Sequence, residues 1–310
     1  MTWLPDVDVV IATRDRPELL RASIHAIFAS DYSGAVRVLV VYDQSEPDPT
    51  LEADLSPSTN DTRSLKLLQN NRTPGLAGAR NTGLVAADAE LVAFCDDDDE
   101  WLPTKLSKQV AALANTPGAE MACCGIGVQY DGQFHRRVLR QDTVTLGDLL
   151  RDRLTELHPS TFVMRRKAVI DGFGLVEEKI PGSYGEDYEF LLRAARSHAI
   201  CNVQMVGVRV LWSKGSYFSG RWTTIREALT WLLDEYPEFE TVPAGEARVL
   251  GQIAFATAGE GKRKQAAGVA WHAIRTRPAE LRSYLALGVA SGLLDPNWVL
   301  RQLHRTGRGL

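Results

Sequence analysis

The stretch ELVAFCDDDDEW, residues 90–101, passes from an apolar segment directly into five consecutive acidic side chains. Its first six residues predict a buried strand, so the acids begin where that strand ends. Two carboxylates about 4 Å apart repel by roughly 1 kcal/mol in water and by roughly 4 kcal/mol at an effective dielectric constant of about 20. A hard divalent cation would compensate this repulsion in a cleft. A solvated loop or a helix N-terminus would tolerate it equally well, so the pattern alone leaves these hypotheses open.

The segments before this stretch alternate between strand and helix patterns. Apolar, β-branched runs predict buried strands at residues 7–12 and 36–42, and two further strands are expected at 64–69 and 90–95. Helical spacing predicts helices at residues 18–29, 79–87 and 104–114, the first of them entered through Pro17. Strands joined by helical crossovers form a parallel α/β sheet, in which ligands bind beyond the carboxyl ends of the strands. We therefore expect Asp43 and Asp96, which follow two of these strands, to lie at that edge.

The chain changes character after residue 120. Residues 121–130 and 133–139 predict a hairpin around Asp131-Gly132, and further strands are expected at 161–165 and 203–211, with a helix at 184–198 between them. Beyond residue 217 the pattern is helical only, with helices expected at 224–236, 244–259, 264–277, 279–291 and 296–304. Residues 266–287 weakly resemble one helical-hairpin (tetratricopeptide) repeat. We predict a catalytic domain at residues 1–220 and a C-terminal helical domain at residues 221–310.

Composition excludes several classes of protein. The 310 residues are 45% hydrophobic and carry a formal net charge of −4, which gives no support for nucleic-acid binding. The four cysteines form no CxxC pair, and we expect them to be reduced, buried thiols. The N-terminus lacks the basic segment of a signal peptide, and no run of 18 apolar residues predicts a transmembrane helix. A cytoplasmic protein is expected, and the mildly basic C-terminal part is compatible with a peripheral position at a membrane.

Two further segments carry residues suited to chemistry. Gly75 and Gly78 let the backbone approach a ligand closely, and Arg80 and Asn81 follow at the start of a helix, whose amides favour anions. A plain loop with a surface arginine would give the same pattern. The segment GSYGED, residues 182–187, brings two adjacent acids to the start of another helix. These acids could cap that helix or provide a general base for a hydroxyl nucleophile.

Taken together, the segments resemble a family 2 inverting glycosyltransferase of the GT-A fold. The family's first strand, roughly VVIPTxNR, corresponds to VVIATRDR at residues 9–16, with Ala12 in place of the usual proline and Asp15 where asparagine is common. Its Asp-Asp-Gly-Ser segment corresponds to YDQS at 42–45, and its Ala-Arg-Asn-x-Gly segment to ARNTG at 79–83. The Asp-x-Asp motif corresponds to Asp96 and Asp98, and the Glu-Asp motif to Glu186 and Asp187. The resemblance covers about residues 6–215.

This resemblance implies a site for a nucleoside-diphosphate sugar. A divalent ion, Mn²⁺ or Mg²⁺, would bind to Asp98 directly, helped by Asp96, while Asp97 and Asp99 orient the loop. Asp187, preceded by Glu186, would be the general base. The residues expected to contact the sugar nucleotide are Ala12, Thr13, Arg14, Arg16, Asp43, Gly75, Arg80, Asn81, Asp96, Asp97, Asp98 and Trp212. UDP is the expected nucleotide, and dTDP and GDP remain open.

The implied reaction is an in-line attack of an acceptor hydroxyl on the anomeric carbon, with inversion. The acceptor could be a glycan, a lipid-linked saccharide or a natural product, and His158 could face it or lie in a solvated loop. Lys214 and Arg221 are candidate phosphate contacts, and a homodimer through the helical tail is a further hypothesis. A sugar-phosphate nucleotidyltransferase is one alternative, although residues 13–17 lack the Gly-rich loop of that class. A non-catalytic sugar-nucleotide-binding scaffold with a helical partner-binding tail is the other.

Overall fold

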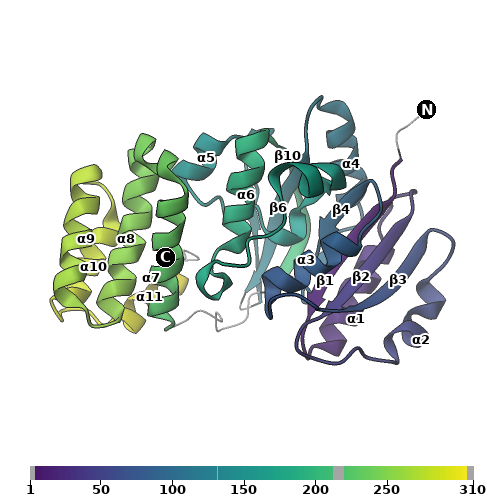
Figure 1. Cartoon of the computed structure of the whole chain (residues 1–310), viewed down its shortest axis with the longest axis horizontal. Helices are drawn as coiled ribbons and strands as arrows, with labels where there is room; N and C mark the ends of the chain where they lie inside the picture. Colours follow the sequence, from purple (N-terminus) through teal and green to yellow (C-terminus); the bar gives the residue numbers. More distant parts are fainter. Residues whose placement is uncertain (1–3, 131, 212–219, 306–310) are drawn as a thin grey trace. The chain divides into compact units, whose positions relative to one another are not determined.

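The protein is described by a computed structural model covering residues 4–130, 132–211 and 220–305 (Figure 1). The strands are β1 Val7–Thr13, β2 Val36–Tyr42, β3 Arg63–Gln69, β4 Leu91–Phe94, β5 Glu100–Trp101, β6 Met121–Tyr130, β7 Gln133–Arg137, β8 Thr143–Val144, β9 Val163–Arg165 and β10 Ile200–Leu211. The α-helices are α1 Pro17–Phe28, α2 Leu51–Leu55, α3 Leu76–Ala86, α4 Lys105–Asn115, α5 Leu146–Arg151, α6 Glu186–Ser197, α7 Trp222–Glu235, α8 Pro243–Gly259, α9 Arg263–Thr276, α10 Leu281–Ala290 and α11 Pro296–Arg305. Short 3₁₀ helices include Pro159–Thr161 and Pro181–Ser183, and a π-helix spans Ala168–Phe173.

The described residues divide into two compact units. The sheet unit comprises the residues up to Leu146, then Leu154–Glu178, and then Glu186 to the end of β10. The helical unit comprises Gly147–Arg153, Lys179–Gly185 and the described residues from Gly220 onward. Two short segments from earlier in the chain therefore belong to the helical unit. A single boundary between residues 220 and 221 would place these segments with the sheet. The predicted functional division into two domains at that point stays a prediction.

The first half of the sheet is parallel, as the sequence predicts. The strands run in the order β3-β2-β1-β4, and the register pairs Val9 with Val38 on one side and with Ala93 on the other. Core residues of β1 and β2 are buried on both faces, which explains their continuous apolar pattern. Helix α3 lies very close to this sheet, because a Cβ atom at Gly83 would fall 2.3 Å from Cγ1 of Val10. The small residue Gly83 therefore allows α3 to approach the middle of β1 closely.

The second half of the sheet is mixed. Strand β9 pairs antiparallel with both β4 and β6, and β6 runs parallel to β10. The predicted hairpin is confirmed by the antiparallel pairing of β6 with β7, with Asp131 of its turn outside the described residues. The longest ladders of the sheet are parallel, in agreement with the mostly parallel α/β sheet that the sequence predicts. All four cysteines are free and buried, in agreement with the sequence prediction.

The helical unit is built around small side chains. Its core contains Ala254, Phe255 and Ala258 of α8, together with alanines of α9 and α10 and Val299 of α11. Trp222 at the start of α7 packs edge-on against Phe255, with ring centroids 5.8 Å apart. These helices form the expected C-terminal all-helical extension. Within the described parts of the chain, no helix has both the length and the apolar character needed to cross a bilayer.

One core residue of the sheet unit is chemically unusual. Lys105, the first residue of α4, is fully buried, and its ammonium group has no hydrogen-bond partner among the described residues. The Nζ atom lies 3.5 Å from the centre of the Trp101 ring, a cation–π contact. Burial lowers the pKa of Lys105 to about 8, because the charged form loses its hydration. This residue therefore costs folding free energy at neutral pH.

We expect Lys105→Met to raise the free energy of unfolding at pH 7 by about 1–3 kcal/mol, since it keeps the aliphatic stem and removes a buried charge. The folded pKa of Lys105 lies below its ordinary value of 10.5, so the unfolded chain binds more protons between about pH 8 and 10.5. Wild-type stability should rise with pH in this window, and the advantage of the variant should shrink there. Urea titrations at several pH values measure both effects.

Lys108→Met is the matched control, because Lys108 is exposed on the same helix. It should leave the pH dependence of stability unchanged between pH 8 and 10.5. A Lys105→Met variant that is less stable than wild type at pH 7 would contradict this account of Lys105.

Candidate active site

The aspartate run forms a tight turn beyond the end of β4. The backbone amide of Cys95 donates to the carbonyl of Val10 in β1 (3.1 Å), and the amide of Asp99 donates to the carbonyl of Asp96 (3.2 Å). The hydroxyl of Ser23 donates to the carbonyl of Asp99 (2.7 Å). Asp97 and Asp99 are only 6% and 2% exposed, so the run is not a fully solvated loop. The turn is held at the carboxyl end of the sheet, where α/β folds bind ligands.

Two of the acids are partnered by the loop that follows β1. Asp97 accepts hydrogen bonds from the hydroxyl of Thr13 (2.7 Å) and from Nη1 of Arg16 (3.3 Å). The same Nη1 atom lies 2.9 Å from Oδ2 of Asp98. Burial raises the pKa of Asp98 to about 6, and the negative charges of Asp99, Asp96 and Asp97 add to this effect. The half-exposed Arg16 alone therefore does not compensate the negative charge of the acids at positions 96–99.

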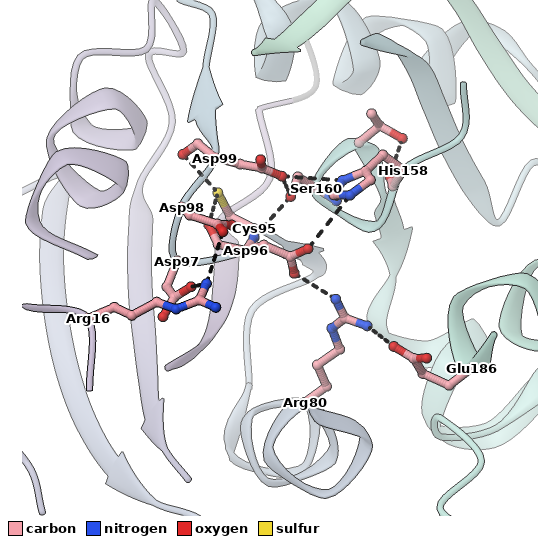
Figure 2. Close-up of polar contacts among 11 residues, drawn as sticks. Arg16, Arg80, Cys95, Asp96, Asp97, Asp98, Asp99, His158, Ser160 and Glu186 are labelled. Atoms are coloured by element: carbon pink, nitrogen blue, oxygen red, sulfur yellow. Dashed lines mark hydrogen bonds and ion pairs between the residues drawn. The ribbon is translucent and has the colours of Figure 1, made fainter. Parts of the chain in front are cut away.

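Arg80 connects the aspartate run to the predicted base motif, as Figure 2 shows. This residue is 2% exposed, and its side chain projects from α3 between two carboxylates. Its Nη2 atom donates to Oδ1 of Asp96 (2.6 Å), and its Nη1 atom donates to Oε1 of Glu186 (3.0 Å). Segments that are far apart in the sequence, around residues 80, 96 and 186, are thereby brought into one buried ionic network.

The Glu-Asp pair begins helix α6. Burial raises the pKa of Glu186 to about 7, the charge of Asp187 adds to this effect, and the cation of Arg80 opposes it. Asp187 is partly buried and therefore more accessible than Glu186. Glu186 is engaged by Arg80, and the role of Asp187 as the general base stays a prediction.

His158 lies directly beside the aspartate run (Figure 2). Its Nδ1 atom is 3.2 Å from Oδ2 of Asp99, and its Nε2 atom is 3.9 Å from Oδ2 of Asp96. Burial lowers the pKa of His158, but the charges of Asp99, Asp96 and Asp187 outweigh it and raise the pKa to about 9. Ligand atoms of Asp96, Asp99 and His158 all lie within 4.8 Å of one another. Asp98, which the resemblance favours as the direct metal ligand, is not a member of this cluster.

Ser160 lies on the same side of the turn as His158; it belongs to the candidate acceptor-side segment 158–161, but no role of its own was predicted for it. Its hydroxyl donates to Oδ2 of Asp99 and accepts from the backbone amide of Asp96 (2.9 Å). The residue is fully buried in the 3₁₀ helix before β9. Nothing in the local pattern of residues 158–161 indicates that it would meet the aspartate run, because the contact depends on the antiparallel pairing of β9 with β4.

Two of the predicted nucleotide contacts have several protein partners. The buried carboxylate of Asp43 accepts from the amide nitrogen of Gly75 (3.0 Å) and the side chains of Asn70 (2.7 Å) and Gln44 (2.9 Å). Burial raises the pKa of Asp43, but these hydrogen bonds outweigh it and the pKa is lowered. The amide of Asn81 exchanges hydrogen bonds with the backbone of Val176 (2.8 and 2.9 Å). Both side chains fix loops at the sheet edge, and their contact with a nucleotide stays a prediction.

The remaining predicted residues lie on β1 or directly after it, before α7, or outside the described parts of the chain. Ala12 is half-buried at the end of β1, and Arg14 is exposed, with its Nε atom 3.8 Å from Asp15. Arg221 is exposed before α7. Trp212 and Lys214 fall outside the described residues.

Comparison with known proteins agrees with this architecture. Residues 8–173, more than half of the chain, match the family described as "Glycosyl transferase family 2". The chain therefore belongs to glycosyl transferase family 2.

Individual relatives share part of the sequence. The Escherichia coli protein "UDP-Glc:alpha-D-GlcNAc-diphosphoundecaprenol beta-1,3-glucosyltransferase WfaP" is 31% identical over 104 residues, which are 34% of this chain and 39% of that protein. The Campylobacter jejuni "GalNAc(5)-diNAcBac-PP-undecaprenol beta-1,3-glucosyltransferase" is 33% identical over 104 residues, which are 34% of this chain and 33% of that protein. The matched region thus spans well under half the length of these relatives.

Solved structures resemble the fold over most of the chain. TarS residues 1–349 from S. aureus, in complex with UDP-GlcNAc, superimposes with a TM-score of 0.61 at 17% identity, covering 98% of this chain and 92% of TarS 1–349. The mannosyltransferase PcManGT from Pyrobaculum calidifontis, in complex with GDP-Man and Mn²⁺, gives a TM-score of 0.60 at 18% identity and covers 96% of this chain and 83% of PcManGT. At these identities the likeness establishes the fold.

Proposed function

We propose that this protein is an inverting glycosyltransferase that moves a sugar from a nucleoside-diphosphate sugar to an acceptor hydroxyl. The observation that carries the proposal is the buried Arg80, whose two nitrogen atoms join Asp96 to Glu186. This bridge brings the acidic turn at the sheet edge and the Glu-Asp pair of α6 into one network. Such a network combines a site for an anionic leaving group with a carboxylate able to accept a proton.

The acidic turn has the donor set of a divalent metal site. Asp96 and Asp98 are partly exposed, and Asp99 and His158 lie beside them, so carboxylate oxygens and an imidazole face the same region. The elevated pKa of Asp98, caused by burial and neighbouring carboxylates, reflects negative charge that a cation would relieve. Oxygen ligands suit Mg²⁺ and Mn²⁺. When bound, the ion would offset the charge that develops on the diphosphate leaving group.

Residues of the chain itself would accept the proton, position the base and contact the phosphates. Asp187 would take the proton from the acceptor hydroxyl as that oxygen attacks the anomeric carbon. Glu186, held by Arg80, would fix the start of α6 and so the direction of Asp187. Arg16, which contacts Asp97 and Asp98 with a half-exposed side chain, is placed to meet a phosphate. A single displacement by the acceptor needs no covalent enzyme intermediate and inverts the anomeric carbon.

The proposed donor is a UDP-sugar. The names of the E. coli relatives specify UDP-Glc, and TarS was solved with UDP-GlcNAc, whereas PcManGT was solved with GDP-Man. The proposed acceptor is a lipid-linked saccharide, since the E. coli and C. jejuni relatives are named for diphosphoundecaprenol-linked substrates. Action at the membrane surface would follow from such an acceptor.

A hydrolysis screen tests the proposal without an acceptor. Purified protein is incubated with UDP-, GDP- and dTDP-sugars in the presence of Mn²⁺, and free nucleoside diphosphate is measured against an EDTA control. A glycosyltransferase should release the diphosphate of one sugar nucleotide slowly, and EDTA should abolish the release. A nucleotidyltransferase would instead form nucleoside triphosphate and sugar 1-phosphate when pyrophosphate is added. The absence of any metal-dependent nucleotide binding in calorimetry would favour the non-catalytic scaffold.

A further inference from the structure

The loop of residues 70–75, between β3 and α3, holds the carboxylate of Asp43 from both of its ends. At its start, the side chain of Asn70 donates to Oδ1 of Asp43 (2.7 Å). At its end, the backbone amide of Gly75 donates to both carboxylate oxygens (3.1 and 3.0 Å). Gly75 has a φ of 118°, which residues with a side chain rarely adopt. The orientation of the Asp43 carboxylate therefore depends on the conformation of the 70–75 loop.

The 70–75 loop lies against helix α3. A Cβ atom at Gly78 would fall 1.9 Å from the carbonyl oxygen of Thr73, so the loop backbone lies directly on the helix at this point. One turn further along α3, the hydroxyl of Thr82 donates to Oδ1 of Asn70 (2.9 Å). Residues 71–74 are otherwise exposed, so a small number of contacts determines their conformation.

Glu178 makes three of these contacts. Its carboxylate accepts hydrogen bonds from Nε of Arg72 (2.6 Å), from the backbone amide of Thr73 (3.3 Å) and from Nδ2 of Asn81 in α3 (2.7 Å). The amide of Asn81 also exchanges hydrogen bonds with the backbone of Val176 (2.8 and 2.9 Å), two residues before Glu178. All of these residues belong to the sheet unit. One side chain thus joins two consecutive residues of the loop to α3.

This arrangement requires a carboxylate. Oε1 of Glu178 accepts from Arg72 and Asn81, and Oε2 accepts from Thr73, so both oxygens face N–H donors. A glutamine has the same shape, but its NH₂ group would face a donor in either orientation. Burial raises the pKa of Glu178, but the hydrogen bonds from these three donors outweigh it and lower the pKa to about 2. The group is therefore ionised at neutral pH.

We infer that Glu178 is a positioning residue for nucleotide binding, because it holds the 70–75 loop in the conformation that orients the carboxylate of Asp43. This inference rests on the proposed function, since it takes Asp43 as a nucleotide contact. Glu178 itself need not touch the nucleotide. Its loss should raise the KM for the sugar nucleotide and leave kcat at saturation near that of wild type, since the aspartate run and the Glu-Asp pair are unchanged.

The test is a double-mutant cycle of Glu178→Gln and Asp43→Asn, with the Kd for UDP measured by calorimetry in the presence of Mn²⁺. Glu178→Gln alone should raise Kd on the order of 10-fold, because hydrogen bonds to a charged group are lost, and should leave kcat within about twofold. In the Asp43→Asn background the same substitution should change Kd by less than about twofold, since residues that act through one another are not additive. Glu52→Gln, at an exposed glutamate of the same unit, is the matched control and should leave Kd and kcat unchanged.

A second measurement and a second variant complete the test. Hydrogen exchange of the amides of residues 72–75 should be faster in Glu178→Gln than in wild type, which reports on the loop without any ligand. Glu178→Asp covers the case in which Glu178→Gln does not fold, because it keeps the charge and shortens its reach, and it should raise Kd in the same direction. Unchanged UDP affinity in the folded variant, an equal loss of affinity in both backgrounds, or unchanged exchange in the loop would overturn the inference and leave the proposed function standing. A wild-type protein without metal-dependent binding or turnover of any sugar nucleotide would overturn the proposed function itself.

Discussion

Asp187→Asn should lower turnover at least about 100-fold, while affinity for the sugar nucleotide stays near that of wild type. The amide has nearly the shape of the carboxylate but cannot accept the proton of the acceptor hydroxyl at neutral pH. Asp187 lies at the start of α6, next to the buried Glu186, and not among the atoms of the aspartate run. Donor release rates and calorimetry with UDP and Mn²⁺ together separate turnover from binding.

The control for this prediction is Asp171→Asn, which changes an exposed acid of the same sheet unit. It should leave both turnover and binding unchanged. Turnover of Asp187→Asn within a few-fold of wild type would remove Asp187 from the role of base and point to another proton acceptor, with Glu186 as the first candidate.

Asp96→Asn should weaken Mn²⁺-dependent binding of UDP at least about 100-fold, more than the 10- to 100-fold typical of residues that only support a ligand. Asp96 is the member of the run that faces both Arg80 and His158, so its loss affects both candidate metal arrangements. Calorimetry with UDP in the presence of Mn²⁺ or EDTA measures the nucleotide, and the paramagnetic resonance signal of free Mn²⁺ measures the ion. The exposed Asp31 provides the control Asp31→Asn, which should bind both as wild type does.

The same measurement distinguishes two ligand sets. If Asp98 is the direct ligand, Asp98→Asn should abolish Mn²⁺ binding and His158→Gln should have a small effect. If the ion is held by the cluster of Asp96, Asp99 and His158, His158→Gln should weaken Mn²⁺ binding more than Asp98→Asn. Unchanged Mn²⁺ and UDP binding in Asp96→Asn would exclude the aspartate run as the metal site.

Strands β1, β2 and β4 of the parallel half could be predicted from the sequence because they are buried on both faces, whereas β3 at the edge of the sheet is only partly buried. Residues 36–42 are apolar except for Arg37 and rich in valine, which favours a strand, and the observed strand β2 has the same bounds. The helical pattern of residues 224–236 was equally clear, because α7 buries Ala228, Leu229 and Leu232 on one face. By contrast, the short α5 and the π-helix Ala168–Phe173 were not predicted, since neither has enough turns for a periodic pattern.

The candidate site was predictable only in part. The acids at 96–99 and the pair at 186–187 stand out as local patterns, and the resemblance to family 2 relates them to each other. Their burial and their partners depend on the tertiary structure. Arg80 contacts Asp96 from helix α3, and His158 and Ser160 contact the run because they directly precede the antiparallel strand β9. The assignment of Lys179–Gly185 to the helical unit is likewise not indicated by local hydrophobic periodicity.

The most direct test of the central claim is proton NMR of the released sugar. The protein is mixed with Mn²⁺ and the α-linked sugar nucleotide that the hydrolysis screen selects, and the anomeric signals are followed before mutarotation. Metal-assisted inverting transfer predicts that the β-anomer of the free sugar appears first, together with the nucleoside diphosphate, and that EDTA stops both. Initial release of the α-anomer, or release that EDTA does not affect, would contradict the proposed mechanism.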